Sequence, residues 1–102
     1  NLDDIERFAD HIGIIHQGKL LLEGPTSHLI NRFRVIDCTH TNGAAVATIP
    51  GVYAHKNDHG RWRLLIDTQT LNPDRLTEHG FTSITATPVT LEELFVQLVK
   101  GF

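Results

Sequence analysis

The sequence contains no methionine, even at position 1, and a single cysteine among its 102 residues. Cys38 has no partner for a disulfide within the chain, which favours a reducing compartment. No apolar run exceeds a few residues, so the sequence predicts neither a transmembrane helix nor a signal-peptide core. Because the first residue, Asn1, already lies on a helical pattern, we expect the chain to be a segment of a longer protein.

An excess of positive charge is also missing. The net charge of -3 argues against a general nucleic-acid or membrane-surface binder, although it leaves a local basic patch open. The rest of the composition, 40% hydrophobic and 21% charged, is typical of a soluble globular protein. At this length the chain fits one domain, or one small domain with part of another.

Residues 10–24 predict a β-hairpin, because two short apolar runs flank a polar connection that contains a glycine. The same stretch holds Gly13, four further residues and then Gly18-Lys19, which comes close to a phosphate-binding loop. Such a loop needs Ser or Thr after the lysine to hold magnesium, and a helix that begins there. Here Leu20 follows the lysine and the next residues favour strand. We therefore interpret the stretch as a hairpin and not as a nucleotide site.

Apolar residues at spacings of three and four predict a helix on each side of this hairpin. The first includes Leu2, Ile5, Phe8, Ala9 and Ile12, and the second opens at Pro25 or Thr26 with Leu29, Ile30 and Phe33 inward. Further on, the pattern predicts strands at residues 34–39, 52–56, 62–66 and 81–87, with short helices at residues 44–49 and 71–80. The helix at residues 44–49 is ambiguous, because its alanines favour helix whereas its β-branched residues favour strand.

The last predicted element is an amphipathic helix with a capping box. Thr90 can cap it through its hydroxyl, and Glu93 three residues later completes the box. Its apolar residues form one continuous face: Leu91, Leu94, Phe95, Leu98 and Val99. We interpret the helix as structural, and Leu91, Leu94, Phe95 and Leu98 as a candidate interface.

The order of elements predicts an α+β fold. From residue 34 it is strand, helix, strand, strand, helix, strand, helix, which is the ferredoxin-like βαββαβ order with an added C-terminal helix. The helix–hairpin–helix before it cannot bury both faces of its two strands by itself.

The chain offers few candidates for chemistry. Its seven histidines lack metal-site spacing: His11 and His16 face opposite sides of a strand, and His55 and His59 flank a turn without a third ligand. We favour solvated histidines on turns and edges. In Arg61-Trp62-Arg63, a cue for phosphate or nucleic acid, alternation predicts a core tryptophan between two solvent-facing arginines. Cys38 is expected to be a small buried hydrophobe. Nothing predicts a catalytic residue, a bound cofactor or a metal.

Residues 1–29 resemble the segment that follows the switch histidine in ATP-binding subunits of ABC transporters. The matching features are Leu2, the acidic Asp3-Asp4 with Glu6, Asp10-His11-Ile12, the strand Ile14-Ile15, the turn Gln17-Gly18-Lys19, Leu20 to Leu22, and Glu23-Gly24. The departures are His11, where the family commonly has arginine, and Ile5, where it commonly has alanine. By this alignment the switch histidine is expected immediately before Asn1.

The C-terminal end resembles the same group a second time. Thr87-Pro88-Val89-Thr90-Leu91-Glu92-Glu93-Leu94-Phe95 is similar to the ending of ATPase subunits of drug- and polysaccharide-type exporters. Those subunits carry a small accessory domain after the ATPase core, and Ile49-Pro50-Gly51-Val52 resembles its Leu-Pro-Gly-Val turn. The resemblance implies that residues 1–33 end an ABC ATPase core and that residues 34–102 form the accessory domain.

The resemblance further implies that this chain is a non-catalytic, regulatory part of a parent that hydrolyses ATP with magnesium. The family's nucleotide-binding and catalytic motifs all lie upstream. The implied partners are the chain's own ATPase core, a second copy of that core and a transmembrane permease, without nucleic acid, at the cytoplasmic face of the cell membrane. Residues 12–22, an edge hairpin, could also self-associate. The alternative is a free-standing ferredoxin-like regulatory module that binds a small ligand or a metal.

Overall fold

The computed structural model describes residues 10–40 and 46–102, which form two antiparallel sheets and few helices. The elements in chain order are β1 (His11–His16), β2 (Lys19–Pro25), α2 (Thr26–Arg32), β3 (Phe33–Thr39), η1 (Val46–Thr48), β4 (Val52–Asp58), β5 (Arg61–Asp67), η2 (Pro73–His79), β6 (Thr82–Pro88) and α3 (Leu91–Lys100). No helix among them is both long enough and apolar enough to cross a membrane. The predicted first helix lies outside the described residues except for Ile12, which belongs to β1.

The predicted hairpin is confirmed. β1 and β2 pair antiparallel across a two-residue turn, in which Gln17 and Gly18 have φ values of 51° and 77°. Two positive φ values in succession suit the right-handed twist of a tight hairpin, and glycine adopts them without a steric penalty. β2 begins at Lys19, so a strand stands where a phosphate-binding loop would begin a helix.

The second sheet has four antiparallel strands in the order β4-β5-β3-β6. All four were predicted, and their observed bounds extend the predicted ones by one or two residues at most ends. The connections after β3 and β5 contain the 3-10 helices η1 and η2, at positions where the sequence predicts short helices. The longer one, η2, contains a single buried apolar residue, Leu76, so no i, i+3, i+4 stripe favours an α-helix over tighter turns. Part of the predicted residues 44–49 lies outside the described residues.

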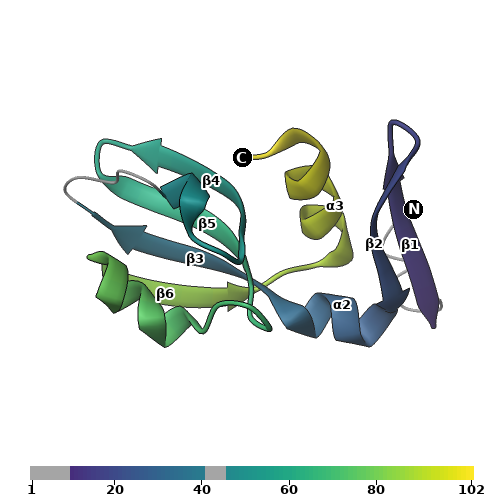
Figure 1. The fold of residues 1–102 in the computed structure, drawn as a ribbon, viewed down its shortest axis with the longest axis horizontal. Helices are drawn as coiled ribbons and strands as arrows, with labels where there is room; N and C mark the ends of the chain where they lie inside the picture. The colour runs from purple at the N-terminus through teal and green to yellow at the C-terminus, as the bar shows by residue number, and fades with distance from the viewer. Residues whose placement is uncertain (1–9, 41–45) are drawn as a thin grey trace.

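The four-stranded sheet has a separate hydrophobic cluster on each face. One cluster lies against η1 and η2 and is built from Ile36, Cys38, Val46, Ile49, Trp62, Leu64, Ile66, Leu71, Leu76 and Phe81. The other comprises Ile14, Leu22, Leu29, Phe33, Val35, Ala54, Leu65, Val89, Leu91 and Leu94. This second cluster joins the hairpin, α2 and α3 to the sheet. Figure 1 shows α3 standing between the sheet and the hairpin, with α2 connecting them below.

Candidate functional site

Helix α3 begins at the predicted N-cap residue, Thr90. The Thr90 hydroxyl oxygen accepts a hydrogen bond from the Glu93 backbone N–H at 3.1 Å, and the hydroxyl lies 3.2 Å from the Glu93 carboxylate. The end is also as expected, with Lys100 in the last turn and Gly101 at the cap. The cap fixes where the helix starts, and therefore which side of α3 meets the sheet.

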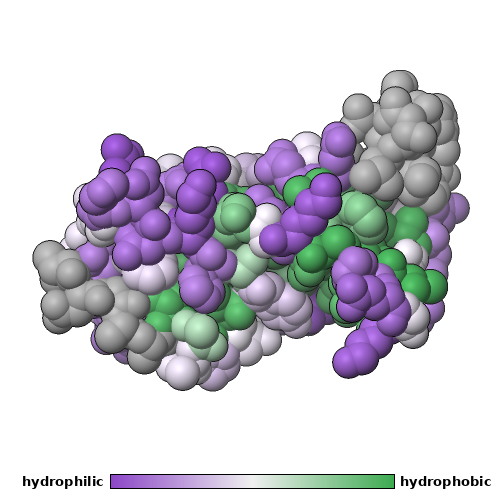
Figure 2. Space-filling model, turned by 90° about the horizontal axis from the view of Figure 1, so that it is seen from above, coloured by the Kyte–Doolittle hydropathy of each residue, from purple (hydrophilic) through white to green (hydrophobic). Residues whose placement is uncertain are grey.

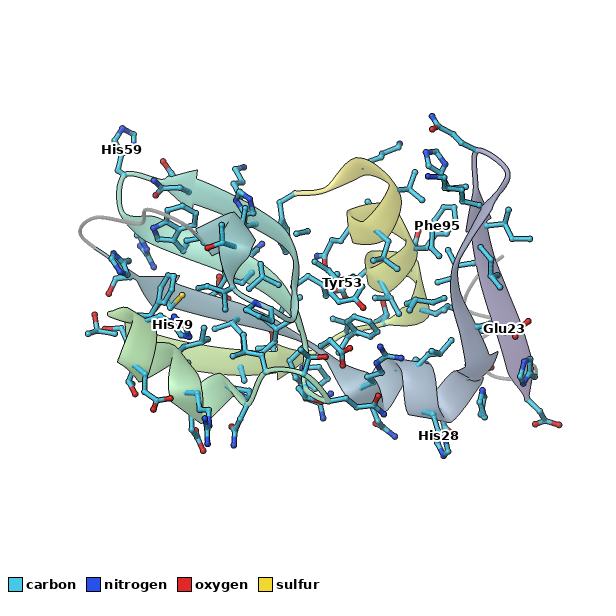
Figure 3. The ribbon with its side chains drawn as sticks, viewed as in Figure 1. Glu23, His28, Tyr53, His59, His79 and Phe95 are labelled. Carbon is cyan, nitrogen blue, oxygen red and sulfur yellow. The ribbon has the colours of Figure 1, made fainter. Side chains whose placement is uncertain are left out.

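The four residues of the candidate interface do not share one environment. Leu91 and Leu94 are buried in the core of this same chain, and Leu98 packs against that cluster while partly buried. Phe95 keeps 36% of its surface exposed, and Figure 3 shows it on the side of α3 that faces the hairpin. Of the four side chains, Phe95 is therefore the one most available to a partner.

Besides Phe95, an exposed apolar pair lies at the end of the hairpin. Ile15 and Leu20 are register partners across β1 and β2, with 64% and 54% of their surfaces exposed. Their neighbours Ile14 and Leu22 face the other way and join the core. The hairpin thus packs on the rest of the chain through Ile14 and Leu22. In Figure 2 hydrophobic residues gather over the α3 and hairpin half, and hydrophilic residues cover the far end of the sheet.

The histidines occupy separate positions. His28, His59 and His79 lie on α2, the β4–β5 turn and η2, well apart from one another in Figure 3. His59 Nδ1 lies 2.7 Å from Asp58, and the His55 ring tilts against Trp62 with centroids 6.0 Å apart. Within the two described stretches, no three His, Cys, Asp or Glu side chains are arranged to hold a metal ion.

A buried ion pair, which the sequence reading missed, ties α2 to the end of β5. Arg32 donates to Asp67 twice, from Nε at 2.9 Å and from Nη2 at 2.6 Å. The Asp67 side chain is 1% exposed and also accepts from the Gln69 backbone N–H. Burial alone would raise the pKa of Asp67, but these hydrogen bonds and the charge of Arg32 outweigh it and lower that pKa. The partners lie 35 positions apart in the sequence, which explains why no local pattern reveals the pair.

The predictions for the start of β5 hold. Trp62 is buried, and the arginines on either side of it are exposed. Cys38 is buried as expected, and burial, with the nearby charge of Asp37, raises the pKa of its thiol to about 11. A thiol that stays protonated at neutral pH is a poor nucleophile, so Cys38 is a core residue.

A concavity among the described residues lies over the far half of the four-stranded sheet. It has a volume of about 510 Å³, and its lining residues are Asp37, Cys38, Thr39, Lys56, Asp58, Arg61, Trp62, Arg63, Ser83 and Thr85. Because side chains alternate across a strand, Cys38 and Trp62 point into the core on the opposite face and contribute backbone here. The near half of the same face is apolar and lies under α3. The depression is therefore the open, polar half of a surface whose other half is covered.

The register places the polar side chains in two rows across the strands. In the first, Lys56, Arg63, Asp37 and Thr85 lie opposite one another in turn along β4, β5, β3 and β6. Within this row Arg63 Nε donates to Asp37 at 3.0 Å. The second row contains Asp58, Arg61, Thr39 and, across the irregular part of β6, Thr82. The sequence pattern pointed to the two arginines but not to Lys56. A signal for the full set was available in the sequence, because charged residues alternate on both sides of the turn. They are Lys56 and Asp58 before it and Arg61 and Arg63 after it.

Comparison with known proteins gives one informative similarity. The chain is similar to the bacitracin transport ATP-binding protein BcrA of Bacillus licheniformis, with 32% identity over 120 residues. The match covers 98% of this chain and 36% of that protein, so the chain spans little more than a third of its relative's length. No protein-family model and no solved structure matches the sequence.

Proposed function

We propose that this chain is the C-terminal part of the ATP-binding subunit of an ABC transporter. The observation that carries the proposal is the similarity to a transport ATP-binding protein across 98% of the chain. The ABC-like motifs at its two ends, residues 1–29 and 87–95, support the same assignment independently of the overall identity.

In this proposal residues 1–33 end the ATPase core and residues 34–102 form a ferredoxin-like accessory domain, for which the strand order β4-β5-β3-β6 is supporting evidence. ATP and magnesium would be bound by parts of the subunit outside this chain. The subunit would work at the cytoplasmic face of the membrane with a second copy of itself and a permease. The chain's own role would be to pack on the ATPase core or on the partner subunit and to tune their association.

The exposed apolar side chains are the natural contacts for that packing. Phe95 on α3 and the pair Ile15 and Leu20 on the hairpin remain partly or largely exposed in this chain. Burying a large apolar side chain contributes about 1.5–3 kcal/mol, so covering all three could stabilise an association by several kcal/mol. In the chain by itself the same pair could instead meet a second copy, which would appear as a concentration-dependent dimer.

The test uses an intact ATP-binding subunit that carries this sequence. Deleting residues 34–102 should lower its thermal stability or change its ATPase rate, and the accessory role fails if neither changes. A finer test replaces Phe95 with serine. The control is Val96→Ser, because Val96 is similarly exposed at 40% but points about 100° away around the helix. Equal effects of the two substitutions would contradict a contact through Phe95.

The second candidate is a free-standing regulatory module, and the depression over the open half of the sheet is the observation in its favour. A real ligand raises the melting temperature by mass action. Titrating zinc and a panel of metabolites against the chain while following its thermal unfolding therefore separates the two functions. Stabilisation by one compound, together with no effect of the chain on any ATPase, would favour the module.

A further inference from the structure

The depression holds more positive charge than its own acids neutralise. Of its three cations, Arg63 is paired with Asp37. Arg61 lies opposite Asp58 in the register, yet the Asp58 carboxylate is engaged by His59 at 2.7 Å. Lys56 and Arg61 form no ion pair or side-chain hydrogen bond within the described parts of the chain.

The placement of Lys56 is unfavourable unless an anion is present. Lys56 and Arg63 are direct register partners on β4 and β5. Like charges directly opposite each other in an antiparallel pair destabilise the sheet. Arg63 uses its Nε for Asp37 on the other side, so its Nη groups remain available to a bound ligand. An anion between the two strands would remove the repulsion and use donors from all three cations.

The rim of the depression on β6 is irregular, which adds hydroxyl groups to the same surface. The β3–β6 register shifts between Asp37 and Thr39, and Ser83 opposite this shift has a left-handed φ of 54°. A non-glycine residue in that region is strained, and bulges of this kind redirect a side chain next to functional sites. Ser83 and Thr85 both line the depression and supply hydroxyl donors beside the cations.

The charge and the volume indicate one class of ligand. The three cations of the lining exceed its two carboxylates by one charge, and their free donors match a phosphomonoester, which carries a charge of about −1.5 to −2 at neutral pH and three strong acceptor oxygens. A volume of about 510 Å³ is far larger than a phosphate group and falls within the usual range of small-molecule sites, so it leaves room for the esterified part. The one aromatic residue in the lining, Trp62, is buried, so the depression lacks the stacking platform that single-stranded nucleic acids use.

We propose that the open half of the sheet binds a phosphomonoester group through Lys56, Arg61 and the free Nη groups of Arg63, with Ser83 and Thr85 as additional donors. The phosphate belongs either to a soluble metabolite or to a lipid headgroup. This site does not depend on the ABC assignment, because it uses only charges and geometry within residues 37–85.

The experiment follows backbone amide shifts of the 102-residue chain during titration with inorganic phosphate and with glycerol 3-phosphate, at constant ionic strength set with chloride. A parallel arm measures sedimentation with phosphatidylcholine vesicles that contain phosphatidic acid, against phosphatidylcholine alone. The test variant is Lys56→Gln/Arg61→Gln. The matched control is Lys19→Gln/Arg75→Gln, which removes the same charge from exposed positions on β2 and η2.

Glycerol 3-phosphate or the phosphatidic acid vesicles should bind, with amide shifts concentrated at residues 37–39, 56–63 and 83–85. The test variant should bind at least tenfold more weakly at an unchanged melting temperature, and the control should bind like the wild type. Binding of glycerol 3-phosphate without the vesicles identifies a soluble metabolite as the ligand. Binding of the vesicles without glycerol 3-phosphate identifies a lipid headgroup. Shifts spread over all basic residues, equal binding by the test variant, or no binding in either arm would overturn the proposal.

Discussion

The ion pair between Arg32 and Asp67 gives the sharpest prediction for stability. Removing one partner of a buried pair costs about 3–5 kcal/mol, because the remaining charge stays in a poorly solvated place. The two partners differ in exposure, with 26% for the Arg32 side chain and 1% for Asp67. The cost should therefore depend on which charge is left behind.

In Asp67→Asn the stranded guanidinium can be partly hydrated, and the new side chain can still accept from the Gln69 N–H. We expect a loss of about 2–3 kcal/mol, below the full cost of an unpaired buried charge. In Arg32→Met the carboxylate of Asp67 stays buried without its two strongest donors, and we expect about 3–5 kcal/mol. The specific prediction is that Arg32→Met lowers the free energy of unfolding more than Asp67→Asn does.

The pH dependence follows from the lowered pKa of Asp67. Since the folded-state pKa lies below the unfolded value of about 3.9, the stabilisation is fully present above that value and is lost as the pH falls through the folded pKa. The free-energy gap between the wild type and Asp67→Asn should therefore be constant from pH 7 to about pH 5 and should narrow in more acidic solution.

Urea unfolding measures these differences, and the fluorescence of Trp62, the one tryptophan in the chain, reports the transition. Asp37→Asn is the control, because it removes the exposed Arg63–Asp37 pair and should cost less than about 1 kcal/mol. Equal losses in Asp67→Asn and Asp37→Asn would refute the role of burial. A smaller loss in Arg32→Met than in Asp67→Asn would refute the argument from exposure.

Three further predictions concern the helix cap, a glycine turn and the cysteine. Thr90→Ala should lower the free energy of unfolding by about 1 kcal/mol and Thr90→Ser should not; equal losses in urea unfolding would contradict the cap. Gly51→Ala should lower the free energy of unfolding by about 1–3 kcal/mol more than Gly18→Ala does. Both glycines have a positive φ, but only at Gly51 would a Cβ lie 2.7 Å from the Leu71 side chain, so equal losses would exclude the clash. Burial raises the pKa of Cys38 to about 11, so iodoacetamide should alkylate it slowly in the native chain and rapidly in urea, and equal rates would show an accessible thiol.

Local patterns predicted the elements that local physics determines. The hairpin turn, the strands and the start of α3 at Thr90 each depend on residues within a few positions of one another. The type of the crossover helices was not predictable in this way. The pattern of residues 71–80 contains a proline and a terminal glycine that fit any helix, and the single buried residue of η2, Leu76, does not distinguish one type of helix from another.

Features built from distant segments were the ones missed. The Arg32–Asp67 pair joins residues 35 apart, and nothing near either one marks it. The candidate phosphate site was seen in part: strand alternation placed Arg61 and Arg63 in solvent, as the structure has them. Lys56 joins them because the register of the β4–β5 hairpin places it opposite Arg63. Because the position of a hairpin turn sets the register of its strands, this register could be predicted from the sequence.

The position of β3 has a consequence for how this chain reaches its fold. β3 lies in the middle of the four-stranded sheet, yet its neighbours come much later in the chain, and its bond with Thr87 spans 52 residues. The two hairpins, β1–β2 and β4–β5, close short loops and can form within microseconds. Pairing β3 with β5 and β6 instead requires the closure of long loops, and the entropy lost in closing them slows folding. The hairpins are therefore expected to form first, and the central strand to be the last to find its partners.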